Sequence, residues 1–372
     1  MVDFKNMPRQ KRFFYISAIC SCCLSLFIAT YLTLLSFIAV ALCSVTFSII
    51  FIIESIDEDV KNWKKKEFFK YFLLATLGFH LTAFYHASAE ICFNAEKKDQ
   101  MFVDFDSFFF GKFWPKGQIS LWLDQHPKLN PDTKYGMFLN TFFQCFYMIY
   151  FLIPVICVFG HPLIGCIKET IKTSKNKGVY SQNYFKAWNE MYFFGACFIN
   201  SYMPVIFGNI LFPAWSPRLY LEEYYTKELK FYYLIQKISL RKNHSANSFP
   251  SGHIAETSVF IYAMHLFGYK KLEAFVFTCS FMICLATMIL RCHYFADVCI
   301  SIPIGIWAFY LVYRFGYLSE KKRLAYVELE KISDHEINKI SMDENINNYN
   351  TFNNNNNNNV NIDNKDNDIN KV

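Results

Sequence analysis

Residues 13–53 contain no Asp, Glu, Lys or Arg. One helix needs about 20 apolar residues to cross a lipid bilayer. The run is roughly twice as long as one crossing requires, so it predicts two helices that cross and return as a hairpin. A second charge-free run covers residues 135–167. The chain is therefore expected to be an integral membrane protein.

The composition of the whole chain agrees with this expectation. Of the 372 residues, 53% are hydrophobic, 19% aromatic and only 18% charged, whereas a soluble domain carries about 25% charged residues. This balance excludes a soluble enzyme, a disulfide-knotted secreted domain and a nucleic-acid-binding protein. We interpret the net charge of +6 as a signal of membrane topology. The 13 Cys residues show no zinc-site spacing and permit no assignment of disulfides.

The expected fold is all-α, a polytopic transmembrane bundle of about eight spans. The spans that we expect are 13–32, 35–53, 68–92, 138–160, 190–212, 252–269, 272–291 and 294–316. The expected parts are an N-terminal hairpin with a basic loop (1–66), helices with an aromatic lumenal loop (67–189), a core with the candidate chemistry (190–318), a cytoplasmic helix extension (319–340) and an Asn-rich tail (341–372). The tail lacks the apolar surface needed to fold and is expected to be disordered.

The Lys and Arg residues give the predicted orientation. Short basic stretches occur at residues 1–12, 54–67 and 168–189, at Lys270 and Lys271, and after residue 320. With both termini in the cytoplasm, all of these stretches lie on the cytoplasmic side, as the positive-inside rule requires. The loops 93–137 and 213–251 then lie on the lumenal or outer side. The aromatic stretch 100–123 predicts an interfacial belt at headgroup level, or alternatively a lid over a lipid site.

Two short segments carry the candidate chemistry. Ser248-Phe249-Pro250-Ser251-Gly252-His253 opens the sixth expected span, and His293-Tyr294-Phe295-Ala296-Asp297 opens the eighth. The two His residues are 40 positions apart, which corresponds to two spans of about 20 residues. The chain therefore crosses and returns, and both His side chains are expected at the same membrane face.

The residue types suit phosphoryl transfer. The free N–H groups of a helix that begins at Ser251 and Gly252 can bind a phosphate. His293 and Asp297 are i and i+4 on a helix, so the carboxylate can fix the imidazole tautomer. We therefore expect His293 to be a nucleophile and His253 to be the acid that protonates the leaving oxygen. The alternative for each single His is a packing or interhelical hydrogen-bonding role.

These segments resemble the type 2 phosphatidic acid phosphatase superfamily of integral membrane enzymes. The stretch that ends at His253 is similar to the second signature of that family, and His293 with Asp297 is similar to the end of the third. The resemblance covers roughly residues 190–316. It implies a phosphorylated His293, a supporting Asp297, and His253 as acid and base. It implies neither a metal nor another cofactor.

The departures from the family pattern bear on the substrate. The family usually has Arg six residues before the nucleophilic His, where this chain has Thr287. That change, and the segment from Phe212 to Arg218, resemble the inositol phosphorylceramide synthase branch, whereas Gly252 leans toward the phosphatases. A phosphodiester carries one charge and needs fewer cations than a monoester. Arg291 either supplies the missing cation or is a snorkelling residue at the interface.

The phosphate-binding residues that we expect are Ser251, Gly252, Arg291 and Arg218. Glu256 is a possible auxiliary residue near His253, and its alternative is an interhelical hydrogen bond. The partners that we expect are membrane lipids, with ceramide or water as acceptor, and no nucleic acid. The site is expected on the lumenal side of the Golgi or endoplasmic reticulum. The rival functions are a lipid phosphate phosphatase and a non-catalytic transporter or scaffold that keeps the fold.

Overall fold

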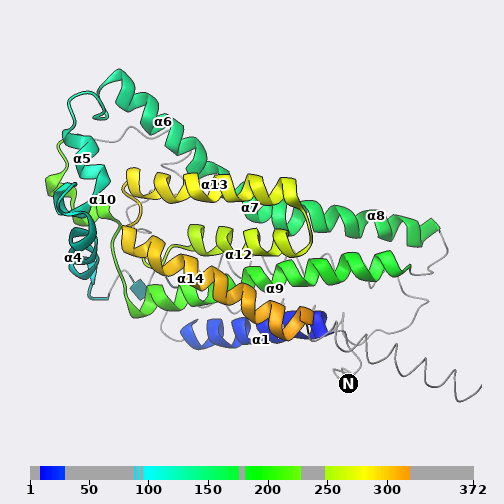
Figure 1. Cartoon of the computed structure of the whole chain (residues 1–372). Coiled ribbons are helices and arrows are strands. Elements are labelled where there is room, and N and C mark those ends of the chain that lie inside the picture. Colours follow the sequence, from blue (N-terminus) through cyan, green and yellow to red (C-terminus); the bar gives the residue numbers. More distant parts are fainter. Residues whose placement is uncertain are drawn as a thin grey trace, which may run out of the picture. The chain divides into compact units, whose positions relative to one another are not determined.

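The computed structural model describes residues 9–29, 88, 91–92, 95–175, 181–227 and 248–318. The elements in these ranges are helices (Figure 1). The described residues do not include the expected span 35–53, most of the expected span 68–92, or residues 319–372. The expected number of eight spans and the expected disorder of the Asn-rich tail therefore stay predictions.

Within the described ranges, four helical segments are long and apolar enough to cross a membrane. They are Lys134–Lys175, Gln182–Leu211 (α9), Lys270–Ile289 (α13) and Phe295–Tyr317. The first comprises α6 (Lys134–Ile149), α7 (Leu152–Pro154), a π-helical stretch (Val155–Gly160) and α8 (His161–Lys175), and the last comprises α14 (Phe295–Val312) and a π-helical end (Tyr313–Tyr317). For this part of the chain, the prediction of helices throughout, several of them long and apolar enough to span a membrane, is confirmed.

Two further helices match expected spans. Helix α1 covers Arg9–Ala29. Helix α12 covers Gly252–Leu266, with 15 residues, so it is shorter than the roughly 20 residues of a full crossing. It ends at Phe267 and Gly268, where Gly268 has a φ of 75°, a backbone conformation that glycine adopts readily. The turn leads directly into α13, as the sequence predicts for a pair of antiparallel helices.

The helix ends differ from the prediction where polar side chains extend a helix beyond its apolar run. Helix α9 begins at Gln182 rather than near residue 190, because the hydroxyl of Ser181 accepts a hydrogen bond from the N–H of Tyr184 at 3.1 Å and caps the helix. Helix α8 continues to Lys175, within the segment expected to be a cytoplasmic loop. Hydropathy predicts only the apolar part of a helix, whereas the capping residue determines where the helix begins.

The core of the bundle lies around α12, which packs against α9, α13 and α14 (Figure 1). Large buried side chains from these helices include Phe193, Phe194, Phe260 and Met264. Gly305 in α14 faces α12, and a Cβ atom there would lie 2.5 Å from the carbonyl oxygen of Ala255. A small residue is therefore required at this contact, which holds the helix of His253 against the helix of Asp297.

A second group of short helices covers the end of the bundle at which α12 and α14 begin. It contains α4 (Asp99–Phe110), the 3₁₀ turn Pro115–Gly117, α5 (Ile119–Gln125), α10 (Pro217–Tyr220) and the 3₁₀ turn Glu222–Tyr224 (Figure 1). Its apolar core includes Phe102, Phe249 and Tyr294. The segment predicted as an aromatic loop therefore contains two helices that pack against the segments with the candidate chemistry.

Candidate active site

The side chains of His293 and Asp297 lie against each other at the start of α14. His293 Nδ1 is 2.9 Å from Asp297 Oδ2, and both residues are buried. The same carboxylate oxygen accepts the backbone N–H of Tyr294 at 3.0 Å and lies 2.9 Å from the hydroxyl of Ser248. Three donors therefore converge on one oxygen of Asp297, and these contacts fix the imidazole ring.

The other ring nitrogen of His293 faces the start of α12. Its Nε2 atom is 3.2 Å from the hydroxyl oxygen of Ser251, the residue before the first turn of α12. Because the carboxylate is a hydrogen-bond acceptor facing Nδ1, we assign the proton to Nδ1 and the free lone pair to Nε2. The atom with the lone pair therefore points toward the end of the helix that was expected to bind phosphate.

Among the described residues, no side chain caps the N-terminus of α12. The N–H groups of the first turn of a helix have no partners within the helix itself. The backbone N–H of Ser251 donates to the hydroxyl of Ser301 at 2.8 Å, which ties the start of α12 to α14. The turn from Ser251 to His253 is thus held in place with donors available for an anion.

His253 lies beside His293, with ring centroids 5.5 Å apart and planes at 67°. Its Nε2 atom is buried and has no hydrogen-bond partner within the described part of the chain. Tyr150 lies against the ring of His253, with a centroid distance of 4.0 Å, and donates its hydroxyl proton to Glu256 Oε2 at 3.0 Å. The structure thus brings His253, His293 and Asp297 together, with Glu256 linked to His253 through Tyr150.

The turn that carries His293, residues 290–296, begins with a Schellman motif. The N–H of Cys292 donates to the carbonyl of Thr287 at 2.8 Å, and the N–H of Arg291 donates to that of Met288 at 3.2 Å. Arg291 occupies the left-handed position of this motif, with a φ of 63°, where glycine is the usual residue. The hydroxyl of Thr287 donates to Cys284 in its own helix. Thr287 therefore serves the turn and not a ligand.

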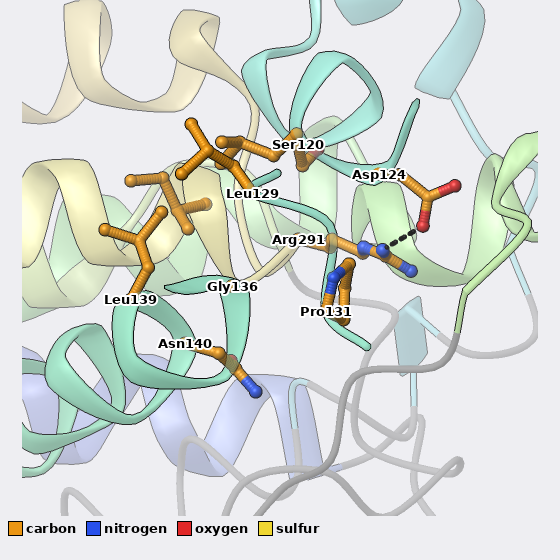
Figure 2. A pocket seen from close by; sticks show the side chains of 10 residues that line it. Ser120, Asp124, Leu129, Pro131, Gly136, Leu139, Asn140 and Arg291 are labelled. Carbon is orange, nitrogen blue, oxygen red and sulfur yellow. Dashed lines mark hydrogen bonds and ion pairs between the residues drawn. The ribbon is translucent and has the colours of Figure 1, made fainter. Parts of the chain in front are cut away.

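The guanidinium of Arg291 is directed to a buried acid (Figure 2). It lies 2.8 Å from Asp124 Oδ1, donates to the carbonyl of Lys227 at 3.0 Å, and stacks on the ring of Tyr225 at 3.7 Å. Burial lowers the pKa of Arg291, but a guanidinium remains charged at neutral pH. The residue expected to replace the family's Arg is therefore committed to an ion pair with Asp124.

Arg218 is placed differently. Its backbone N–H donates to the carbonyl of Arg291 at 3.0 Å, which brings α10 beside the His293 turn. Over the described ranges, no hydrogen bond or ion pair engages its side chain. Of the two arginines expected to bind phosphate, Arg218 is therefore the one whose charge is not neutralised by a carboxylate.

Three buried acids that the sequence analysis did not single out hold this part of the molecule together. Asp106 accepts the N–H groups of Phe295 and Ala296 at 2.9 and 3.0 Å and so caps α14. Asp99 accepts the hydroxyl of Tyr294 at 2.8 Å. Burial raises the pKa values of Asp99 and Asp106 to about 6. Asp124, which pairs with Arg291, also accepts the N–H of Thr226 at 2.8 Å.

A local signal could have revealed the first two of these acids. Asp99 and Asp106 are seven residues apart in an apolar segment, so on a helix they share one face. Acidic side chains that are buried on one face of a helix are expected to form hydrogen bonds or ion pairs with other parts of the protein. Ser248 is the first residue of the segment that ends at His253. Its contact with Asp297 could not be predicted from the sequence, because it joins segments that only the fold brings together. In the described ranges, no group of three or more acidic, His or Cys side chains could hold a metal ion.

The fold and the site define a helical membrane protein with a buried His–Asp pair facing a second His. Comparison with known proteins agrees. Residues 193–321, about a third of the chain, are the part that matches the PAP2 superfamily. Both His residues, Asp297 and the two arginines lie within it, whereas Asp99, Asp106 and Asp124 lie outside it.

One curated relative is similar to a larger part of the chain. A PA-phosphatase related-family protein of Dictyostelium discoideum is 27% identical over an alignment of 251 residues, and the match covers 63% of this chain. The matched part is 44% of the relative's own length, so the chain spans less than half of this relative. No solved structure matches the chain.

Proposed function

We propose that this protein is a membrane lipid phosphotransferase that acts through a phosphohistidine at His293. The preferred reaction moves phosphoinositol from phosphatidylinositol to ceramide and releases diacylglycerol. The observation that carries the proposal is the orientation of His293, whose Nδ1 lies 2.9 Å from Asp297 and whose Nε2 faces Ser251. That orientation suits a nucleophilic Nε2 beside a phosphate held by the first turn of α12.

The proposed reaction has two steps. His293 Nε2 attacks the phosphorus, the bond from phosphorus to the diacylglycerol oxygen breaks, and His253 gives a proton to that oxygen. The hydroxyl of ceramide then attacks the phosphorus and gives its proton to His253, and the bond between phosphorus and Nε2 breaks. Asp297 stabilises the charge that develops on His293 in each step.

The charges around the site favour a diester as donor. Arg291 is paired with Asp124, and an uncharged Thr287 occupies the position of the family's Arg. Of the described arginines beside the site, Arg218 is then the one available to a ligand. A phosphodiester carries one negative charge and can be held by the α12 N-terminus with one cation, whereas a monoester approaches two charges.

The second candidate is a phosphatase that hydrolyses phosphatidic acid or a related lipid monoester. It is favoured by the similarity to a PA-phosphatase related-family protein and by Gly252 at the position where the synthase branch often has a larger residue. The catalytic residues are the same, with water in place of ceramide in the second step. In both versions we propose a site on the lumenal side of an internal membrane, with lipids as partners.

A lipid assay on purified protein in mixed micelles separates the two functions. One reaction contains labelled phosphatidylinositol and ceramide, and a parallel reaction contains phosphatidic acid. Inositol phosphorylceramide that is absent from the His293→Ala protein supports the transferase. Inorganic phosphate from phosphatidic acid without a ceramide product supports the phosphatase. If neither product forms in a folded protein, the proposed function is wrong.

A further inference from the structure

Helix α4 has three distinct faces. With 100° between successive residues, the buried residues Asp99, Phe102, Val103 and Asp106 fall on one side. This side holds the His293 turn through the contacts of Asp99 and Asp106. This face is therefore occupied by protein. The other two faces are more exposed, although Gln100 accepts the hydroxyl of Tyr220 at 2.9 Å and Phe109 lies 6.2 Å from the ring of Phe295.

The second face of α4 is apolar and exposed. Met101, Phe105, Phe108 and Phe109 have exposed fractions of 50, 39, 84 and 50%, and they span about 100° of the helix circumference. Phe113, just after the helix, is 72% exposed. Such a continuous apolar surface on a folded protein marks a contact with a partner or with lipid.

The third face is a narrow polar strip. Gln100 and Asp104 are exposed and bond to each other, with Gln100 Nε2 2.7 Å from Asp104 Oδ1. Around its circumference, α4 thus has a face buried in the protein, a polar strip and an exposed apolar face. A helix that lies in the plane of a membrane interface has an apolar face toward lipid and a polar face toward water.

The position of α4 in the fold agrees with an interfacial helix. The N–H of Lys98, just before α4, donates to the carbonyl of Pro213 at 2.9 Å, just after the end of α9. Near its other end, Asp106 caps the first residues of α14. Helix α4 thus runs across the ends of two candidate membrane helices (Figure 1), which is the level at which a bilayer ends.

The flanking residues fit the same environment. Lys112 is exposed between Phe109 and Phe113, where its ammonium group can reach lipid phosphates while the neighbouring rings enter the acyl region. Trp114 follows and stacks on Phe110, with ring centroids 4.8 Å apart. Aromatic rings and Lys are the residues that anchor proteins at the headgroup level.

We propose that α4 is an in-plane membrane helix whose Met101, Phe105 and Phe108 face is inserted among lipids at the boundary between headgroups and acyl chains. The occupant of this surface is lipid, and neither another segment of this chain nor a second copy. The proposal requires only insertion of the chain in a bilayer, so it stands independently of the reaction proposed above.

Photocrosslinking in proteoliposomes of phosphatidylcholine and phosphatidylinositol tests this contact. Benzoyl-phenylalanine replaces Phe108 in one full-length variant and Asp104 in the matched control, on the polar strip of the same helix. Illumination should add the mass of one phospholipid to the first variant and several-fold less to the second. If the Phe108 variant does not fold, replacement of Phe113 provides the same readout.

Three results would overturn the proposal. They are an adduct between position 108 and a peptide of this chain, a crosslinked dimer, and equal lipid labelling at positions 108 and 104. The lipid assay on the unmodified protein is a separate experiment, so failure of the proposed reaction and failure of this proposal can be told apart.

Discussion

Asp297 Oδ2 lies 2.9 Å from His293 Nδ1, while the other ring nitrogen, Nε2, faces Ser251 at the start of α12. The pair is one turn apart in sequence, and the carboxylate also caps the turn from which its helix starts. The same oxygen therefore orients the imidazole and fixes the backbone that carries it. A change at Asp297 should affect the chemistry more than the fold, because Asp106 supplies a second, independent cap to α14.

Asp297→Asn should abolish most of the activity while the protein remains folded. The amide cannot stabilise the imidazolium and favours the wrong tautomer, and the equivalent change in a His–Asp pair of a serine protease costs about 10⁴ in turnover. The measurement is the initial rate of lipid turnover, with thermal unfolding in detergent as the control for folding. A folded variant within tenfold of wild type would remove Asp297 from the proposed mechanism.

Ser248→Ala should lower turnover about fivefold, since it removes one of the three donors to Asp297 Oδ2, and one such hydrogen bond contributes about 1 kcal/mol. Ser280→Ala is the matched control, because Ser280 is also buried and bonds Thr257 at 2.8 Å between α12 and α13. Both variants should lose similar stability. Equal rates for the two proteins would mean that Ser248 does not position Asp297.

Arg291→Ala should destabilise the protein by roughly 3–5 kcal/mol, because Asp124 would be left as a buried, unpaired charge. Arg291→Gly should be less harmful by about 1 kcal/mol, since glycine adopts the φ of 63° at this position without strain. The measurement is unfolding in detergent, where Asp124→Asn in the Arg291→Ala background should restore part of the stability.

A different outcome for Arg291 would assign it to the ligand. If Arg291→Ala unfolded like wild type and raised only the KM for the lipid donor, the guanidinium would bind phosphate in the working enzyme. The ion pair with Asp124 would then be a resting arrangement. Arg218→Ala should raise the KM in either case, because its side chain has no ion-pair partner in the described residues.

Asp106 should make stability depend on pH in an unusual direction. Burial raises its pKa to about 6, whereas an unfolded Asp titrates near 3.9. The folded state therefore binds the proton more tightly, and lowering the pH from 7 to 5 should stabilise it by about 1 kcal/mol through this group. Asp106→Asn should lack this gain. Asp104→Asn, an exposed change in the same helix, should keep it, and parallel curves for all three proteins would contradict the account.

The helices and the His pair were accessible from sequence because their signals are local. Continuous apolar runs predicted α13 and α14 to within a few residues. The spacing of 40 between His253 and His293 predicted that both reach one end of the bundle, and their rings are 5.5 Å apart. Both predictions, the bounds of the helices and the proximity of the two His residues, follow from the length of a helix that crosses a bilayer.

The partners of Arg291 and the role of α4 could not be predicted in the same way. Asp124 is 167 residues from Arg291, and no local pattern selects a partner at that distance. The aromatic residues of α4 predict an interface with lipid, but they obscured Asp99 and Asp106 on the opposite face of the helix. The sequence of a membrane protein predicts its apolar helices well but predicts poorly which polar side chains pair. Contacts such as that between Arg291 and Asp124 are therefore known only from the structure.

The central claim is a covalent bond between His293 and the transferred group, and it can be tested by trapping. Purified protein is mixed with phosphatidylinositol labelled with ³²P in the phosphate and ³H in the inositol, and the reaction is stopped in alkali. The account predicts acid-labile label on the wild-type protein and none on His293→Ala, with both isotopes bound if phosphoinositol is transferred. An active protein that carries no label, or label that persists in His293→Ala, would contradict it.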